Sequence, residues 1–202
     1  MLCDATLDFH SPCRTLNARL LFAVGRYALI DIRPISAAAP HAVEALLDAA
    51  FGTDRHARTA YRLRAGTRAI PRLSFAAFEG GNLVGTLQSW PVVLSSDVHA
   101  SQGLVMVGPV AVLPERQKHG VGRVLMEKLV ETADTDGDDA LMLIGDPEYY
   151  DRFFGFNAEH TGGWEVPGPV ERHRVLARLT SDRLHRLKGM LGPAATDATA
   201  LR

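Results

Sequence analysis

Residues 104–144 constrain the fold of this chain more than any other segment. The apolar run over 104–113 predicts a strand, and it leads into a basic loop that contains Gly120 and Gly122. The apolar residues that follow recur at helical spacing and share one predicted helix face: Val121, Val124, Leu125, Leu129 and Val130. Residues 140–144 then predict a second, buried strand. A strand, a helix and a strand in this order indicate a right-handed crossover between parallel strands, with the glycine loop at the carboxyl end of the first strand.

This glycine loop has the character of a phosphate-binding site. Glycines allow the backbone to close around an anion, and the N-terminus of the helix adds N–H groups and a positive dipole end. Two common nucleotide motifs are excluded by single residues. A P-loop needs Lys and Ser or Thr after its last glycine, where this chain has Arg123 and Val124. A dinucleotide loop needs Gly or Ala where this chain has Leu125.

The loop resembles that of a known family. Gln117-Lys118-His119-Gly120-Val121-Gly122 is similar to the acyl-CoA loop of the GNAT superfamily of N-acetyltransferases, whose signature is Gln/Arg-x-x-Gly-x-Gly/Ala. The resemblance implies acetyl-CoA as co-substrate, with no metal, and charge-assisted contacts from Lys118, Arg123 and Arg116 to its phosphates. The cofactor-binding residues that it implies are Val110, Val112, Gln117, Lys118, His119, Gly120, Val121, Gly122 and Arg123.

A second segment supports the same resemblance. Residues 145–156 look like the Tyr-x-x-x-Gly-Phe segment of the superfamily, in the subgroup with paired tyrosines before an Arg-Phe and a Gly-Phe. Four residues rather than three separate Tyr150 from Gly155, so the alignment admits either tyrosine. We expect Tyr150 to be the catalytic acid, with Tyr149 as its alternative. A packing role for both rings stays open.

The resemblance implies direct attack of a primary amine on the thioester, with no covalent enzyme intermediate. A backbone N–H near Val112 would stabilise the charge that develops on the carbonyl oxygen. Three carboxylates stay open as the base: Asp146, Glu148 and Glu79. The acceptor also stays open between peptide, polyamine, antibiotic and small metabolite. The alternative function is a non-catalytic acyl-CoA-binding sensor module.

The resemblance covers about residues 28–180 and implies a single-domain α/β fold. Its central sheet would be mixed and mostly antiparallel, with a parallel β-α-β crossover at the acyl-CoA loop. Further strands are expected at 28–32, 73–78, 83–90 and 174–179, and helices at 43–51, 55–63 and 149–154. We divide the chain into an extension over 1–26, the acetyltransferase domain over 27–180, and a basic helix with a tail over 181–202.

Composition excludes several classes of partner. The chain has 22 basic and 23 acidic side chains, which gives no general field for nucleic acid or an anionic membrane. No run approaches the roughly 20 apolar residues of a membrane span, and the first residues lack a signal peptide's pattern. Cys3 and Cys13 precede the patterned region and predict neither a disulfide nor a zinc site. We therefore expect a cytoplasmic protein whose predicted carboxyl-terminal helix docks on its own body or on a second copy in a homodimer.

Overall fold

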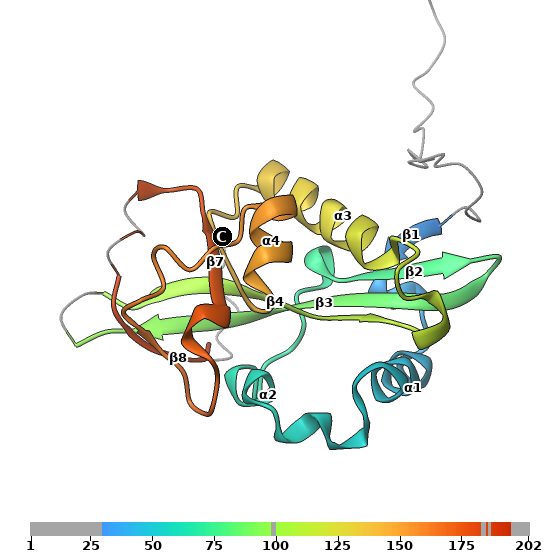
Figure 1. The fold of residues 1–202 in the computed structure, drawn as a ribbon, viewed down its shortest axis with the longest axis horizontal. Helices are drawn as coiled ribbons and strands as arrows, with labels where there is room; N and C mark the ends of the chain where they lie inside the picture. Colours follow the sequence, from blue (N-terminus) through green and yellow to red (C-terminus); the bar gives the residue numbers. More distant parts are fainter. Residues whose placement is uncertain (1–29, 98–99, 183–184, 186, 195–202) are drawn as a thin grey trace, which may run out of the picture.

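The computed structural model describes residues 30–97, 100–182, 185 and 187–194, which form a mixed, eight-stranded sheet (Figure 1). Its order is β1-β2-β3-β4-β5-β7, while β8 pairs with β3 and β6. The strands are β1 (Ile30–Pro34), β2 (Phe75–Glu79), β3 (Asn82–Ser95), β4 (Gln102–Val112), β5 (Ala140–Ile144), β6 (Trp164–Glu165), β7 (Val175–Leu179) and β8 (Gly189–Pro193). Along the main order the β4–β5 pair is parallel and the other pairs are antiparallel. This confirms the predicted sheet and its crossover.

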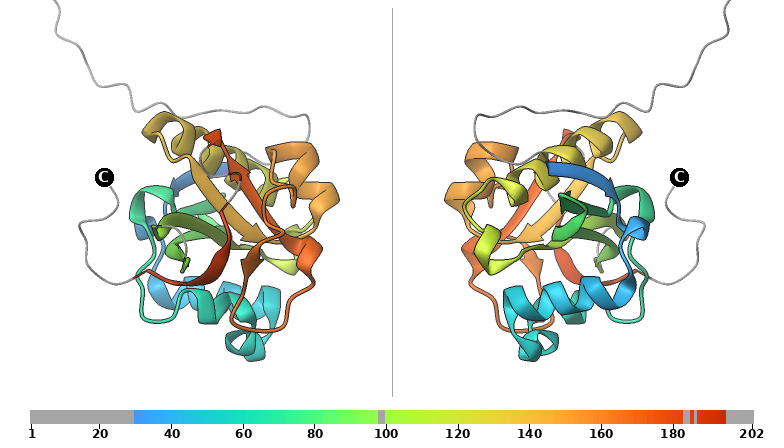
Figure 2. Two further views of the ribbon diagram at one scale, coloured as in Figure 1. Left: turned by 90° about the vertical axis from the view of Figure 1, so that its left-hand side faces the viewer. Right: turned by 90° about the vertical axis from the view of Figure 1, so that its right-hand side faces the viewer.

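In the part of the chain that the structure describes, four α-helices cover the two faces of the sheet: α1 (Pro40–Phe51), α2 (Thr59–Leu63), α3 (Val121–Asp136) and α4 (Pro147–Phe154). Figures 1 and 2 show α1 and α2 on one face and α3 and α4 on the other. The helix expected over 55–63 is interrupted. Residues Thr53–Ala57 form a 3₁₀ turn, and Arg58 is extended before α2 begins.

The first turn of α3 is held directly against the sheet. The buried face of α3 consists of Val121, Leu125, Met126, Leu129 and Ala133. A Cβ added to Gly85 of β3 would lie 2.8 Å from Cγ1 of Val121 and 3.2 Å from Cδ1 of Leu125. The missing side chain at Gly85 therefore lets the helix approach β3 closely. This contact fixes the glycine loop relative to the sheet.

Strands β2 and β3 form a hairpin, in which Gly80 and Gly81 make a two-residue turn with φ values of +57° and +86°. The strand that follows is longer than expected. β3 continues past residue 90 to Ser95, where its last residues pair with β8.

The prediction of a basic helix over 181–191 is wrong for residues 189–191. Residues Gly189–Pro193 form strand β8 instead, with Leu191 opposite Leu94 of β3. Leu191 is buried in the core, and the backbone of β8 pairs with the last residues of β3. Glycine and proline are poor helix formers, so the segment gains more from pairing with this edge than from a helix. The predicted extension over 1–26, with both cysteines, lies outside the described residues.

Candidate active site

Strands β4 and β5 diverge at the carboxyl end of β4. Within these described strands, their pairing covers Val105 with Leu141 and Met106 with Met142, although β4 continues to Val112. The register of β4 against β3 also shifts, so that two residues of β4, 108 and 109, stand opposite Gln88 alone. Such a bulge bends a strand away from its neighbour. An opening therefore lies in the sheet beside residues 107–112.

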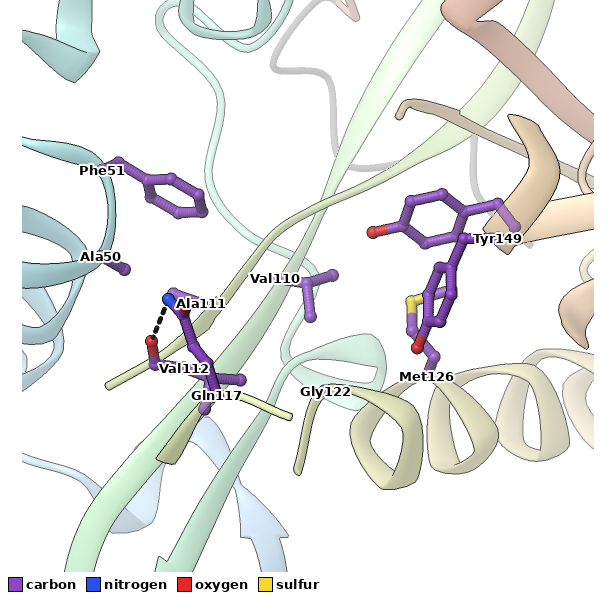
Figure 3. A pocket seen from close by; sticks show the side chains of 10 residues that line it. Ala50, Phe51, Val110, Ala111, Val112, Gln117, Gly122, Met126 and Tyr149 are labelled. Carbon is purple, nitrogen blue, oxygen red and sulfur yellow. Dashed lines mark hydrogen bonds between the residues drawn. The ribbon is translucent and has the colours of Figure 1, made fainter. Parts of the chain in front are cut away.

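The backbone of β4 presents hydrogen-bonding groups to this opening. The N–H of Leu113 donates to the carbonyl of Val84 in β3 at 3.0 Å. Because backbone groups alternate in direction along a strand, Val112 and Val110 direct theirs to the opposite edge, away from β3. The side-chain amide of Gln117 reaches the carbonyl of Val112 on that edge, at 3.4 Å (Figure 3). The N–H groups of Val110 and Val112 therefore face the opening.

A pocket of about 210 Å³ occupies the opening. Its lining residues come from α1, β4, the glycine loop, α3 and α4: Ala50, Phe51, Val110, Ala111, Val112, Gln117, Gly122, Met126, Tyr149 and Tyr150. Figure 3 shows Ala50 and Phe51 on one side of β4 and Met126 and Tyr149 on the other. Since α1 and α3 cover opposite faces, the pocket can admit one reactant from each face of the sheet.

The N-terminus of α3 borders this pocket and has no side-chain cap. Gly120 occupies the N-cap position with φ +83°, in the left-handed region that favours glycine. No acidic side chain lies in the first turn. Gly122 lines the pocket, where a Cβ would lie 3.6 Å from Cγ2 of Val112. An uncapped helix N-terminus offers its first N–H groups and the positive dipole end to an anion.

The predicted basic residues lie around this loop rather than inside the pocket. Lys118 and His119 are exposed, and Lys118 has a left-handed backbone with φ +67°. Arg123 bonds Glu127 at 2.8 Å, and its guanidinium lies 4.9 Å from the centre of the Phe153 ring. Val121 is buried against the sheet, so it can contribute to anion binding through its backbone alone.

None of the three carboxylates considered as bases lines the pocket. Glu79 forms an ion pair with Arg116 at 2.5 Å. Asp146 is the N-cap of α4 and accepts a hydrogen bond from the N–H of Glu148 at 3.1 Å. Among the described residues that line the pocket there is neither a carboxylate nor a histidine.

Tyr149 and Tyr150 bring two phenol groups to the pocket from α4. The Tyr150 ring packs on the backbone of Gly145, where an added Cβ would lie 2.4 Å from a ring carbon. Burial raises the pKa of Tyr150 to about 12, and the nearby Tyr149 and Asp146 add to the rise. Burial also raises the pKa of Tyr149, whose ring lies edge-on to Tyr150 at 5.1 Å. Both phenols therefore remain protonated at neutral pH and can donate a hydrogen bond.

Comparison with known proteins decides the family. The model of the acetyltransferase (GNAT) domain matches residues 31–159 of this sequence. The chain belongs to the GNAT acetyltransferase family. Among the curated proteins, none is significantly similar to this GNAT chain.

Two solved structures illustrate the shared fold. A GNAT family N-acetyltransferase of Escherichia coli (YhbS), in complex with CoA, is 21% identical, with 86% of this chain and 94% of that chain covered and a TM-score of 0.64. A GNAT family acetyltransferase of Brucella melitensis, in complex with acetyl-CoA, is 26% identical, with 82% and 96% covered and a TM-score of 0.56. The strand order and the parallel β4–β5 pair of this GNAT protein are those of the family fold.

The sequence motifs located one side of the site and missed the other. Ala50 and Phe51 end α1 and reach the pocket from the opposite face, and Met126 lines it from α3. In the sequence these residues are ordinary members of apolar helical patterns, so no local signal distinguishes them. In the described part of the chain, no cluster of three metal-binding side chains occurs, and no helix has the length and apolar character of a membrane span.

Proposed function

We propose that this GNAT protein transfers the acetyl group of acetyl-CoA directly to a primary amine. The observation that carries the proposal is the pocket that passes through the sheet beside β4, with an uncapped helix N-terminus at its border and two protonated phenols in its lining. The Brucella relative, whose structure contains acetyl-CoA, supports the choice of co-substrate.

In this proposal, the N-terminus of α3 binds the diphosphate of acetyl-CoA. The backbone N–H groups from Gly120 to Arg123 and the helix dipole favour an anion there, and exposed Lys118 adds positive charge. The N–H groups of Val110 and Val112 at the open edge of β4 hold the thioester end. One of them donates to the thioester oxygen and stabilises the negative charge that forms when the amine attacks.

The reaction needs two proton movements. The amine nitrogen bonds to the carbonyl carbon, the carbon–sulfur bond breaks, and the sulfur leaves as a thiolate that takes up one proton from the Tyr150 phenol, which water then reprotonates. Tyr150 donates a hydrogen bond to this sulfur, because its raised pKa keeps the phenol protonated. The attacking amine must lose a proton, and no carboxylate lines the described pocket, so we assign this proton to water.

The test is acetyl-CoA-dependent release of thiol across a panel of primary amines, with acetyl-CoA binding measured in parallel by calorimetry. Thiol release that depends on the added amine supports the proposal. Binding of acetyl-CoA without amine-dependent release from any member of the panel would instead indicate a non-catalytic acyl-CoA-binding sensor.

A further inference from the structure

A second pocket, of about 250 Å³, lies on the face of the sheet that α1 and α2 cover. We call it the Arg64 pocket. Arg64, Tyr61, Trp90, Arg55, Glu44 and Gln88 are among its lining residues. It adjoins the candidate active site through two elements. Gln88 stands opposite the β4 bulge next to Val110, and α1, which contributes Glu44, also contributes Ala50 to the first pocket.

Arg64 is a buried cation that makes no salt bridge in the described part of the chain. The residue is 6% exposed, and its Nη1 group is buried with no hydrogen-bond acceptor. Its guanidinium lies between two aromatic rings, 3.9 Å from the centre of Tyr61 and 4.5 Å from that of Trp90. Burial lowers the pKa of Arg64, yet an arginine side chain stays charged in proteins. A buried and unpaired charge is strongly unfavourable.

Arg55 lines the same pocket but, unlike Arg64, it forms salt bridges. It is 3% exposed, and its guanidinium bonds Glu44 at 2.5 Å, Asp48 at 2.7 Å and the hydroxyl of Tyr61. The two carboxylates of α1 are therefore engaged by Arg55. Arg64 makes no salt bridge with either carboxylate, although Glu44 attracts its charge at longer range.

Trp90 supplies a second unmatched donor to the pocket. Its indole Nε1–H is also buried and has no acceptor among the described residues. Two buried donors without acceptors call for a group that accepts hydrogen bonds and carries negative charge. A carboxylate offers two acceptor oxygens to these two donors and places one negative charge beside the Arg64 guanidinium, whereas a phosphate monoester brings nearly two negative charges at neutral pH.

We propose that the Arg64 pocket binds the carboxylate of the acceptor, so that the substrate is a primary amine that also carries a carboxylate. This assignment rests on the proposed acetyl transfer. Arg64 and Trp90 hold the carboxylate on the α1–α2 face, and the amine extends past Gln88 toward the opening beside Val110. The acceptor thus approaches from the face opposite to the N-terminus of α3.

Binding is tested without catalysis, by titrating propionate and its neutral isostere propionamide into the protein. The readout is the indole N–H resonance of Trp90, with Trp164, the second of the two tryptophans, as an internal reference. Trp164 is buried elsewhere and donates to the carbonyl of Leu187 at 3.1 Å. We expect propionate to shift the Trp90 resonance saturably, and propionamide and methyl phosphate to shift it far less.

Two arginine variants make this titration specific. Arg64→Met should weaken propionate binding at least tenfold, because it removes a charge-assisted hydrogen bond. Arg68→Met is the matched control, since Arg68 is exposed four residues away. If Arg64→Met is poorly folded, Arg64→Lys replaces it and should weaken binding by less, since it keeps the charge. Equal binding to wild type and to a folded Arg64 variant, or no propionate binding to wild type, would overturn the proposal.

Transfer provides the second readout, with β-alanine compared to β-alaninamide at equal concentrations of free amine. We expect the wild-type kcat/KM to be at least tenfold higher for β-alanine than for β-alaninamide. In Arg64→Met the kcat/KM values for the two substrates should be equal. A preference for the acid that survives in Arg64→Met, or parity in wild type, would contradict the anion site. If no amine is acetylated while propionate still binds through Arg64, acetyl transfer fails and the anion site stands.

Discussion

Tyr150 can occupy its position because residue 145 has no side chain. A Cβ on Gly145 would lie 2.4 and 2.7 Å from two carbons of the Tyr150 ring and 2.9 Å from Cδ1 of Leu143. Carbon atoms in contact are ordinarily about 3.5 Å apart or more, so Gly145→Ala must displace the ring by roughly 1 Å. Gly145 itself is held in place, because its N–H donates to the carbonyl of Arg174 at 3.0 Å.

This displacement should reduce turnover while sparing the binding of acetyl-CoA. A misplacement of about 1 Å in a reacting group can cost roughly 10²-fold in rate. The overpacking should cost about 1–3 kcal/mol of the free energy of unfolding, which a domain of this size can tolerate. We expect kcat for amine-dependent thiol release to fall roughly 10²-fold in Gly145→Ala, with an unchanged calorimetric Kd for acetyl-CoA.

Two controls connect this loss to the Tyr150 hydroxyl. Gly103→Ala in β4 places its Cβ in open space and should leave kcat unchanged. In a Tyr150→Phe background, Gly145→Ala should have little further effect on kcat, because the hydroxyl is already gone. A folded Gly145→Ala protein with full turnover would refute this reasoning, as would an equal loss in the Tyr150→Phe background.

Three further predictions concern the tyrosines and β8. Tyr150→Phe should lower turnover roughly 10²-fold with acetyl-CoA affinity unchanged, and loss in Tyr149→Phe alone would transfer the role to that residue. Because the pKa of Tyr150 is raised from 10 to about 12 in the fold, its contribution to stability is full below pH 10 and disappears as the pH rises through 12. The free energy of unfolding in urea should thus fall more steeply between pH 10 and 12 in wild type than in Tyr150→Phe, and equal slopes would contradict the burial of the phenol. Gly189→Ala should destabilise the protein by about 3 kcal/mol, because its Cβ would lie 1.9 Å from the carbonyl oxygen of Ser95. An exposed glycine within a helix would instead gain about 1 kcal/mol from alanine, so the sign of the change in thermal unfolding distinguishes the strand from the helix.

The central part of the fold was predictable from sequence because its signals are local. In residues 104–144 the spacing of apolar residues changes from that of a strand to that of a helix and back to that of a strand. Gly120 and Gly122 lie where the first strand gives way to the helix. The structure has β4, α3 and β5 in that order. The interruption of the predicted helix at Arg58 and the strand at Gly189–Pro193 depend on partners that are distant in sequence. Arg55 is fixed by α1, and β8 is fixed by the end of β3.

The site also combines residues with a local sequence signal and residues that depend on contacts distant in sequence. The glycine loop and the tyrosines are motif residues, and Gln117, Gly122, Tyr149 and Tyr150 line the same pocket. Phe51 reaches the pocket through packing across the sheet, which a single sequence does not record. The divergence of β4 from β5 was also missed, although the register shift opposite Gln88 falls at Gly108 and Pro109, two residue types that mark bulges within a strand.

The most direct test of the account is a calorimetric titration of acetyl-CoA into variants of Gly120, the left-handed residue before α3. Gly120→Glu and Gly120→Gln have the same shape and backbone strain and differ by one negative charge. Gly137→Glu places the same residue at the opposite end of α3, again in left-handed backbone with open space around it. We expect Gly120→Glu to bind acetyl-CoA roughly 10²-fold more weakly than Gly120→Gln, as one charge about 5 Å from a phosphate would dictate, and Gly137→Glu to bind like wild type. Equal affinities for the folded Glu and Gln variants at position 120 would show that the diphosphate does not bind at the start of α3.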